Sequence, residues 1–337
     1  MTIYDIAKEA GVSASTVSRV MNNKRGVSPD KRRLVEALLN KYNFEPDASA
    51  QGLVSRSSKL IGIVVSDIRT QHHSESAYFI ERQLQKSGYS CMIVNAGFSD
   101  ERRLNGIRLL ASRRVEAAVL IGSTFQTESV KRAIRKYLKS MPVIFENGYF
   151  DLPNVYSILA DERSGIAECL RLLYRKQRKN PWFVSLDDTP SNRLKIDGFL
   201  TAWKQFVPPD TPIEEAPLFQ IKRTPGGDDW DMCYEATKQL IHDHPQIDGI
   251  IYATDFLANA GERALLDIGV RIPEQISLIG VDNSIYTKLS NPRLTTLDNK
   301  MRELSMACAS SLVQILEGGI AAHRTMLLSD IIEAETT

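Results

Sequence analysis

The sequence predicts two folds in one chain: an all-α helix-turn-helix head, followed by an α/β body of two lobes with parallel sheets. Residues 2–22, TIYDIAKEAGVSASTVSRVMN, hold two short helical patterns separated by a glycine. From Leu60 onward, short β-rich apolar runs alternate with amphipathic stretches, a pattern typical of parallel sheets covered on both faces. The 337 residues also exceed what one core usually serves, so more than one domain is expected.

Composition and charge narrow the class of protein. With 43% hydrophobic and 25% charged residues, the chain is typical of a soluble globular protein. No apolar run approaches the roughly 20 residues that span a bilayer. Asp5, Lys8 and Glu9 interrupt the N-terminus, which argues against a signal peptide. We therefore expect a cytoplasmic protein with no membrane partner.

Neither cysteine spacing nor motifs predict a metal, a cofactor or a catalytic centre. The cysteines Cys91, Cys169, Cys233 and Cys308 are scattered and are most simply buried thiols. The chain has no Walker loop, no GxSxG and no HExxH motif. We expect no cofactor and no enzymatic activity. Residues 1–58 carry nine Lys and Arg against six Asp and Glu, in a chain of net charge +1, so a basic head precedes a slightly acidic body.

The first helix of the head is predicted from its cap and its spacing. Thr2 and Asp5 match an N-terminal capping box, and Gly11 can adopt the positive φ that ends a helix. Apolar residues at i, i+3, i+4 and i+7 give this helix one buried face. These residues are Ile3, Ile6, Ala7 and Ala10.

The second helix begins after Ser13, a suitable cap, and would pack through Val12, Val17 and Val20. Its outward face is short or hydrogen-bonding, as a helix that reads the major groove requires. Arg19 could make a bidentate contact to guanine. The alternative is a solvated helix face carrying one arginine. The outward residues are Ala14, Ser15, Ser18, Arg19 and Asn22.

A third helix is predicted from Ser28, a cap, followed by Pro29 and Asp30. We expect Leu34, Val35, Leu38 and Leu39 to form its apolar face. Lys31, Arg32 and Arg33 lie near its start, where they could contact phosphates or form a solvated basic face.

The body is divided by its apolar runs and amphipathic segments. There are too many strand-helix units for one sheet of ordinary width, so two lobes are expected. The predicted strands are Leu60–Val65, Cys91–Asn95, Ala117–Ile121, Val143–Phe145, Trp182–Leu186, Gly249–Ala253, Ile276–Val281 and Thr325–Ser329. The predicted helices include Ala77–Ser87, Ser129–Lys139, Ile166–Lys176 and Phe256–Ile268.

Polar residues just after these strands are candidate ligand contacts. Ligands of such folds lie outside the carboxyl ends of the strands, and a sugar needs a fixed partner for each hydroxyl. The candidates are Asp67, His72, His73, Ser123, Asn147, Arg193, Lys195, Asp255 and Asp282. Trp230 could stack on a sugar ring or a base, or it could pack in the core or lie on the surface.

The chain resembles the LacI/GalR family of bacterial transcription regulators. The matching strings are IYDIAKEAGVSASTVSRVMNN, VSPDKR, FEPDASAQGLVS and LIGIVV, in the order and spacing of that family. The resemblance implies a headpiece over residues 1–45, a hinge helix and linker over 46–58, and a periplasmic-binding-protein-like core over 59–337. Chain crossings near residues 160, 290 and 321 would divide the core into lobe one (59–160 and 291–320) and lobe two (161–290 and 321–337).

The resemblance also assigns roles to residues. It implies DNA contacts from Thr2, Tyr4, Ser13, Ala14, Ser15, Thr16, Ser18, Arg19, Asn22, Ser28, Lys31, Ala50 and Leu53. Leu53, in the hinge segment 47–54, would wedge into the minor groove, at an unstacking cost that kinked DNA repays. Its alternative is a linker residue packed on the core. Gly52 costs about 1 kcal/mol in a helix, so we expect the hinge to fold only on DNA.

For the ligand site, the family comparison sharpens some candidates and weakens others. Asp255, in the string ATDF, matches an acidic position that commonly binds a ligand hydroxyl. Lys195 stands where most members have an arginine, so either it makes a single charged contact or Arg193 takes over. Asn147 stands where many have an aspartate. His72 and His73 replace an aromatic pair, either as ligand contacts or as a plain loop, and adjacent histidines diverge too far for joint metal ligation.

The leading hypothesis is a homodimeric repressor that binds a pseudo-palindromic operator and responds to a small-molecule effector between its lobes. A sugar or sugar phosphate is the first choice of effector, and a purine or nucleoside the second. The short stretch after Ser329 lacks a leucine-heptad extension, which favours a dimer. Two alternatives are a transport-type solute-binding protein without regulatory DNA binding and a sugar-modifying enzyme.

Overall fold

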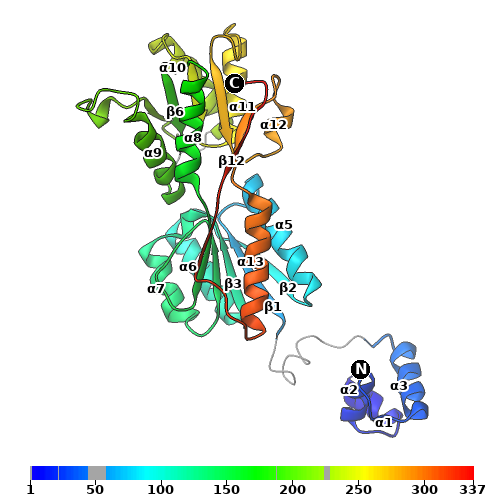
Figure 1. The fold of residues 1–337 in the computed structure, drawn as a ribbon. Coiled ribbons are helices and arrows are strands. Elements are labelled where there is room, and N and C mark those ends of the chain that lie inside the picture. The colour runs from blue at the N-terminus through cyan, green and yellow to red at the C-terminus, as the bar shows by residue number, and fades with distance from the viewer. Residues whose placement is uncertain (1, 22, 45–57, 187, 224–227) are drawn as a thin grey trace. The chain divides into compact units, whose positions relative to one another are not determined.

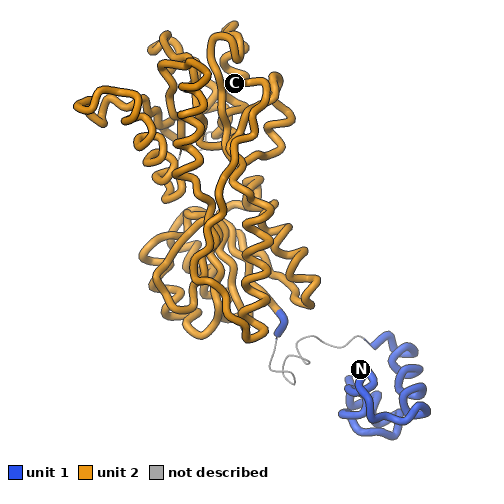
Figure 2. The backbone as a smooth tube through the Cα atoms, viewed as in Figure 1, with its two compact units in different colours: residues 1–59 blue, residues 60–337 orange. Residues whose placement is uncertain are grey.

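The computed structural model of the chain describes residues 2–21, 23–44, 58–186, 188–223 and 228–337. The chain divides into two compact units, Met1–Lys59 and Leu60–Thr337 (Figure 2). The first unit is helical and the second contains two six-stranded sheets (Figure 1). The predicted fold class, a helix-turn-helix head on a two-lobed α/β body, is therefore confirmed.

Three helices form the first unit: α1 (Ile3–Glu9), α2 (Ala14–Met21) and α3 (Pro29–Lys41). Their core consists of the apolar positions that the spacing predicts, namely Ile6, Ala7, Ala10, Val17, Val20, Val35 and Leu38. Leu34 is an exception, because 47% of it is exposed. It lies about 100° around the helix from Val35, outside the stripe that Val35 and Leu38 form one turn apart.

Lobe one is built on a parallel sheet in the order β11-β5-β4-β3-β1-β2. Helices α5 and α13 pack together, as do α6 and α7. The strands are β1 (Leu60–Val65), β2 (Ser90–Asn95), β3 (Ala117–Ile121), β4 (Val143–Glu146), β5 (Val155–Ala160) and β11 (Arg324–Leu327). The helices are α5 (Gln71–Lys86), α6 (Asp100–Ser112), α7 (Glu128–Tyr137) and α13 (Met301–Leu316), with a 3₁₀ turn at Ser123–Phe125.

Strand β1 shows why this sheet is covered on both faces. Ile61, Ile63 and Val65 belong to the core cluster that contains residues of α5 and α13. Val64 points the other way and belongs to the cluster formed with α6 and α7. Gly62 leaves room on that second face for Leu110, because a Cβ there would lie 2.3 Å from a methyl carbon of that side chain. A strand buried on both sides is apolar throughout, as LIGIVV is.

Lobe two contains the sheet β12-β10-β9-β8-β6-β7, parallel except for β12, which pairs antiparallel with β10. The helices form two packed pairs, α8 with α9 and α10 with α11. The strands are β6 (Pro181–Ser185), β7 (Leu218–Gln220), β8 (Gly249–Tyr252), β9 (Ser277–Val281), β10 (Thr295–Asp298) and β12 (Asp330–Ile332). The helices are α8 (Glu162–Arg175), α9 (Pro190–Trp203), α10 (Asp229–Asp243), α11 (Asp255–Asp267) and α12 (Tyr286–Leu289), with a 3₁₀ turn at Ile213–Glu215.

The chain passes between the lobes three times, and two of the passages differ from expectation. The first lies between β5 and α8, after Ala160. The second lies between β10 and α13, not near Ser290, because Thr295–Asp298 pairs with β9 of lobe two. The third lies between β11 and β12, not near Ala321, because Arg324–Leu327 pairs with β5 of lobe one.

Hydrogen bonds tie the three passages to one another. The Asp161 amide donates to the Leu327 carbonyl at 2.9 Å, which joins the first passage to the third. Ser329 Oγ donates to Asn299 Oδ1 at 2.9 Å, and Lys300 Nζ lies 2.8 Å from Asp330 Oδ2, which joins the third to the second. The passages therefore form one connected hinge region rather than three separate linkers.

Helix α5 begins at Gln71, six residues before the predicted Ala77. Its first turns read QHHSES, which lacks an apolar stripe because the buried positions there are the polar residues His73 and Ser76. Within the described ranges, no helix is long and apolar enough to cross a bilayer.

Candidate DNA-reading surface and ligand site

The turn between α1 and α2 holds the head in a defined geometry. Thr2 Oγ1 accepts from the Asp5 amide at 3.4 Å, and the Thr2 amide donates to Asp5 Oδ2 at 2.7 Å, so the predicted capping box is present. The Thr2 amide and the Thr2 hydroxyl, whose Oγ1 lies 2.9 Å from Asp5 Oδ2, both donate to the Asp5 carboxylate and lower its pKa. Gly11 has φ +61°, the left-handed conformation expected at the end of α1.

Helix α2 presents a hydroxyl-rich face. Ser13 Oγ lies 2.8 Å from Ser15 Oγ and 2.9 Å from Thr16 Oγ1, a small network at the start of the helix. Ser15 and Arg19 are exposed, whereas Ala14, Thr16 and Ser18 are half-buried. Such a face offers donors and acceptors within reach of base edges.

Other residues of the predicted DNA surface divide into three groups. Tyr4, 74% exposed, is available on α1, and Lys31 is exposed on α3. Ser28 precedes α3 as expected, but its side chain makes no capping hydrogen bond. Asn22, Ala50 and Leu53, together with the hinge segment 47–54, lie outside the described residues.

Arg32 is not free to contact phosphates. Its guanidinium donates to Asn23 Oδ1 at 3.1 Å and to the Lys24 carbonyl at 2.7 Å. It therefore fixes α3 to the loop that follows α2. Arg33 forms an exposed ion pair with Asp30 at 3.0 Å.

In the body, Lys195 and Asp255 are buried charged groups of lobe two. Lys195 Nζ donates to the Ala253 carbonyl at 2.9 Å and lies 3.4 Å from Glu162 Oε1. Burial alone would lower the pKa of Lys195, but the nearby carboxylates Glu162, Asp282 and Asp255 outweigh it and raise the pKa. The ammonium is therefore retained although only 6% of the residue is exposed.

Asp255 begins α11 and is 1% exposed. The Ser284 amide donates to its Oδ2 at 2.6 Å and Thr296 Oγ1 donates to its Oδ1 at 2.6 Å. Burial, with a smaller contribution from Asp282, raises the pKa of Asp255 to about 7. Gly280 makes room for the carboxylate, because a Cβ there would lie 2.3 Å from Oδ1.

Lobe one contributes a buried carboxylate with a histidine beside it. Glu146, at the end of β4, is fully buried and accepts from Ser76 Oγ at 2.7 Å and Ser305 Oγ at 3.2 Å. His72 Nε2 lies 3.5 Å from Glu146 Oε1. Burial alone would lower the pKa of His72, but Glu146, Asp282 and Glu162 raise it above its ordinary value. The last two belong to lobe two, so charges from both lobes act on this imidazole.

Ser123 joins the lobes directly. Its Oγ accepts from the Ser191 amide of α9 at 3.1 Å, and Ser191 Oγ donates to Glu162 Oε1 at 2.7 Å. The ends of β3 and β4 in lobe one and the starts of α8 and α9 in lobe two therefore meet at one place.

The remaining candidates form hydrogen bonds or ion pairs outside this cluster, or lie at its border. His73 is buried, donates from Nδ1 to the Asp67 carbonyl at 3.0 Å, and has its pKa lowered to about 4, mainly by burial. Asp67 pairs with Arg69 at 2.6 Å, which lowers the pKa of the carboxyl to about 2. Asp282 accepts from Asn299 Nδ2 at 3.1 Å.

Arg193 and Asn147 have structural partners. Arg193 forms an exposed ion pair with Asp188 at 2.9 Å, so it does not replace the neighbouring Lys195 in the buried cluster. Asn147 has φ +53°, a left-handed conformation that asparagine adopts more readily than most residues. Its side-chain oxygen accepts from the Ala160 amide at 3.0 Å.

Trp230 is half-buried in lobe two. Its Nε1 donates to Asn259 Oδ1 at 3.2 Å, and its ring stacks on Tyr234 with centroids 5.5 Å apart. These contacts fit the packing alternative.

Two family models match the chain in the order of its two units. Residues 2–47 match the lacI family of bacterial regulatory proteins. Residues 58–332, more than half of the chain, match the periplasmic binding proteins and sugar binding domain of the LacI family.

The chain belongs to the LacI family.

Named relatives of similar length support the same class. A HTH-type transcriptional regulator from Lachnoclostridium phytofermentans is 29% identical over 100% of this chain and 99% of its own length. The HTH-type transcriptional regulator TreR of Salmonella typhimurium is 26% identical over 98% of both chains. The structure of the lac repressor dimer bound to operator and the anti-inducer ONPF has a TM-score of 0.86 at 23% identity, covering 100% of this chain and 98% of that one.

Membership makes this LacI-family chain a DNA-binding transcriptional regulator with a sugar-binding-like domain. The family consists of regulators rather than enzymes, in agreement with the expectation that this chain is not an enzyme. Among the residues with described positions, no cluster of His, Cys, Asp and Glu could hold a metal ion.

Sequence reasoning missed two central residues of the LacI-family core, Glu146 and Glu162. Both carried a usable signal, because Glu146 directly follows the apolar run VIF and Glu162 follows the run ending at Ala160. The predicted residue, Asn147, lies one position beyond the strand that ends with Glu146. Glu162 was missed because β5 itself was not predicted.

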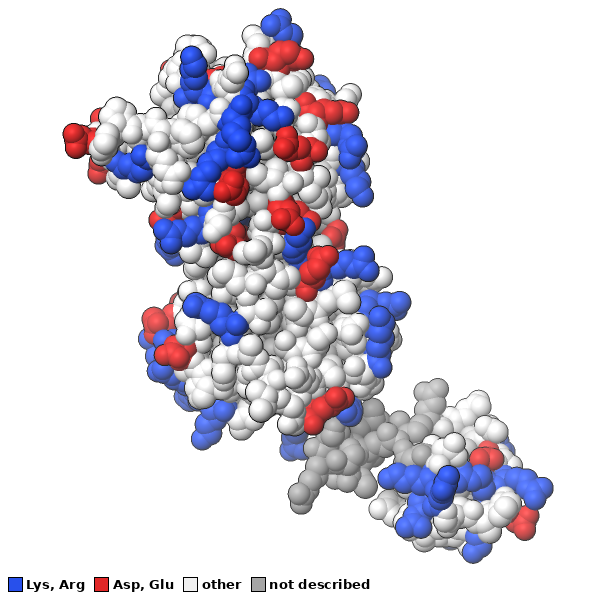
Figure 3. Space-filling view, viewed as in Figure 1, with Lys and Arg blue, Asp and Glu red and all other residues white. Residues whose placement is uncertain are grey.

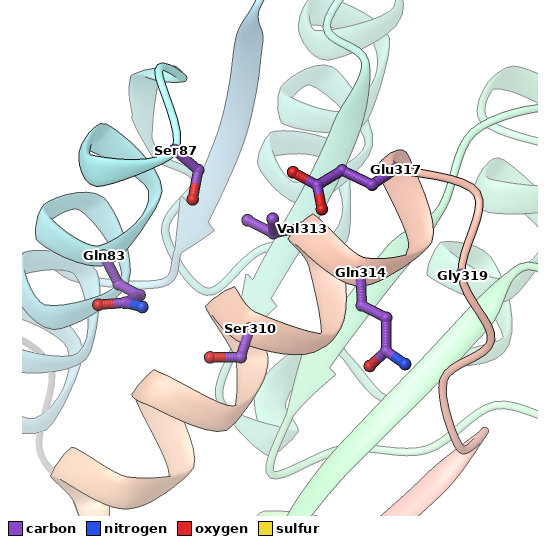
Figure 4. A pocket seen from close by; sticks show the side chains of 7 residues that line it. All are labelled: Gln83, Ser87, Ser310, Val313, Gln314, Glu317 and Gly319. Carbon is purple, nitrogen blue, oxygen red and sulfur yellow. The ribbon is translucent and has the colours of Figure 1, made fainter.

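A surface depression of about 430 Å³ lies elsewhere on lobe one, between the C-terminal ends of α5 and α13 (Figure 4). No predicted ligand residue lines it. Its lining residues are Gln83, Ser87, Ser310, Val313, Gln314, Glu317 and Gly319.

Proposed function

We propose that this chain is a repressor that binds a pseudo-palindromic operator as a homodimer and is controlled by a small molecule held between its lobes. The reading of DNA is supported by α2, where Ser15 and Arg19 are exposed on a helix fixed by the Thr2–Asp5 cap and Gly11. Arg19 is the residue suited to bidentate recognition of a guanine.

The observation that carries the ligand proposal is the charged cluster between the lobes. Lys195, Glu162 and Asp255 from lobe two converge with His72, Glu146 and Ser123 from lobe one. Buried donors and acceptors of both kinds suit a polyhydroxylated ligand, whose hydroxyls donate and accept at once. We therefore propose a sugar or sugar phosphate, with Lys195 as the group that would favour the anionic member.

We propose that coupling runs through the hinge segment 46–58. A ligand that alters the angle between the lobes would alter the spacing of two hinges in a dimer, and hence the fraction of hinge helix that is folded on DNA. Leu53 would then act as the minor-groove wedge. The same coupling acts in both directions, so operator DNA must change effector affinity by the factor by which effector changes operator affinity.

Three measurements test this proposal. Selection of bound duplexes from a random pool, followed by footprinting, should yield a two-fold-related site, and light scattering should give about twice the monomer mass of 37.8 kDa. A thermal-shift screen of sugars, sugar phosphates and nucleosides should raise the transition of the body, because ligand binding stabilises the folded state.

Each part of the proposal would be contradicted by a different result. Absence of any selected site at low salt would contradict the reading of DNA. A response only to nucleosides would contradict the sugar proposal and leave the regulator intact. Selective DNA binding that is unchanged by Leu53→Ala would contradict the hinge mechanism alone.

A further inference from the structure

The edge of lobe one at which the chain enters from the head is unusually basic. In a parallel sheet with intervening helices, each helix ends at the edge where the next strand begins. The register confirms it, because Leu60 pairs with Ser90 and the Glu116 amide donates to the Leu60 carbonyl. The ends of α5, α6 and α7 therefore lie at the same edge as the first residue of β1.

The excess of basic over acidic residues lies in the connections that run from the last turn of each helix to the next strand. In lobe one these connections carry six Lys and Arg against two Asp and Glu. The basic residues are Lys86, Arg113, Arg114, Arg135, Lys136 and Lys139, and the acidic ones are Glu116 and Glu317. Lys and Arg side chains are visible at this end of lobe one in Figure 3.

Lobe two supplies an internal comparison, because its connections have the same topology. They carry eight Lys and Arg against seven Asp and Glu. The basic residues are Arg175, Lys176, Arg178, Lys179, Lys204, Arg271, Lys288 and Arg293, and the acidic ones are Asp210, Glu214, Glu215, Asp243, Asp248, Asp267 and Glu274. Favourable interaction of cations with helix C-termini acts equally in both lobes, so it does not explain the excess in lobe one.

The excess is concentrated at the ends of α6 and α7, which pack together. We call Arg113, Arg114, Arg135, Lys136 and Lys139 the basic edge. Arg113, Arg135 and Lys139 are exposed and form no ion pair with any carboxylate in the described part of the chain. Lys136 Nζ lies 5.2 Å from the centre of the Tyr137 ring, and Lys136 and Arg108 lower the pKa of that phenol through hydrogen bonds.

The chemistry of the basic edge favours a polyanion over a protein partner. Protein interfaces usually bury an apolar core, yet the segments 110–117 and 135–143 expose no large hydrophobic side chain. Exposed arginines and lysines without carboxylate partners are what phosphate groups require. The chain that enters this edge at Leu60 comes from the DNA-reading head, which keeps a bound duplex at high effective concentration near lobe one.

We propose that the basic edge of lobe one binds DNA phosphates, so that the core adds a sequence-independent contact to the one made by the head. This inference rests on the proposed function, because DNA must first be held by the head. The contact would supply affinity and salt dependence but no sequence information.

The test compares two triple variants of the full-length chain. The edge variant carries Arg113→Gln, Arg135→Gln and Lys139→Gln. The control carries Arg175→Gln, Lys179→Gln and Arg271→Gln, which removes the same charge from exposed positions of lobe two. Affinity for a long duplex of random sequence is measured at several salt concentrations, together with the circular dichroism spectrum of each variant.

Removing one cation that binds a phosphate should reduce the slope of log affinity against log salt by about 0.9. We expect the slope of the edge variant to fall by one to three times this amount and the control to keep the wild-type slope. Equal slopes for the edge variant and the wild type would overturn the inference, and so would an equal reduction in the control, which would mark a general effect of net charge. If the wild-type chain binds no DNA at low salt, the proposed function fails as well, so the two failures are told apart.

Discussion

At the scale of single residues, two neighbouring cations on α9 have opposite environments. Lys195 is 6% exposed and lies among Glu162, Asp255 and Asp282, whereas Arg193 faces solvent beside Asp188. Removing one partner from a buried charge cluster leaves the others uncompensated, while an exposed pair contributes little.

We therefore predict that Lys195→Met destabilises lobe two by about 3 kcal/mol or more, whereas Arg193→Met costs less than about 1 kcal/mol. Both changes remove one positive charge from the same helix, which makes the second a matched control. Urea denaturation followed by tryptophan fluorescence reports on the right part, because Trp182, Trp203 and Trp230 all lie in lobe two. Equal losses of unfolding free energy in the two variants would contradict the distinction between a buried and an exposed cation.

The raised pKa of Asp255 predicts that the free energy of unfolding depends on pH. Its pKa is about 7 in the folded protein against 3.8 for the free side chain, and burial is the main cause. Between these values the folded state retains a proton that the unfolded state has released. The free energy of unfolding therefore falls as pH rises from about 4 to about 7, by at most about 1.4 kcal/mol per pH unit from this group.

Asp255→Asn removes that titration and still offers an acceptor to Ser284 or Thr296. We expect the stability of the wild type relative to the variant to be greatest near pH 4 and to decline toward pH 7, measured by urea denaturation at half-unit steps. Titrations common to both proteins cancel in the difference. A difference that does not vary with pH would mean that Asp255 is ionised throughout.

At the scale of elements, a substitution on α2 can distinguish contacts to phosphates from contacts to base edges. A lysine at position 19 keeps the charge that attracts phosphate but lacks the planar fork that matches guanine. We predict that Arg19→Lys weakens binding to the selected operator by about 1–3 kcal/mol and leaves affinity for random DNA nearly unchanged. Competition between the two duplexes at constant salt measures the ratio. An equal weakening on both would identify Arg19 as a phosphate contact.

The elements also show what sequence could and could not predict. The three head helices and the buried strands β1 and β3 follow from local patterns, because caps, glycine and continuous apolar runs act within a few residues. The start of α5 and the strands β7, β10 and β12 were missed, since they are short or polar and the strands are specified by pairing with other strands. Strand β5 was missed although it is six residues long and mostly apolar.

The buried charged cluster between the lobes was predicted at its edges and missed at its centre for the same reason. Asp255, Lys195 and His72 stand at strand or helix ends, where the family pattern draws attention. Glu146 accepts hydrogen bonds from Ser76 and Ser305, which are 70 and 159 residues away in the sequence. Only the folded chain brings those hydroxyls to one carboxylate.

At the scale of the whole molecule, the two lobes are joined through the connected hinge region. The Lys300 ammonium lies 2.8 Å from Asp330 and 3.2 Å from Asp298, and these hydrogen bonds raise its pKa. It thus links the second passage to the third, beside the bond from the Asp161 amide to the Leu327 carbonyl. The proposed change of the angle between the lobes requires a hinge that is held in register yet opens at modest cost.

We predict that Lys300→Met lowers the free energy of local opening at the hinge by about 1 kcal/mol, which corresponds to about fivefold faster hydrogen exchange of the Asp161 amide and its neighbours. Lys176→Met is the matched control, because Lys176 pairs with Glu333 at 2.9 Å beyond the hinge. Exchange in β1 and β8, inside the two lobes, should not change in either variant. Faster exchange throughout both lobes would indicate global destabilisation, and unchanged exchange at Asp161 would show that Lys300 does not hold the passages together.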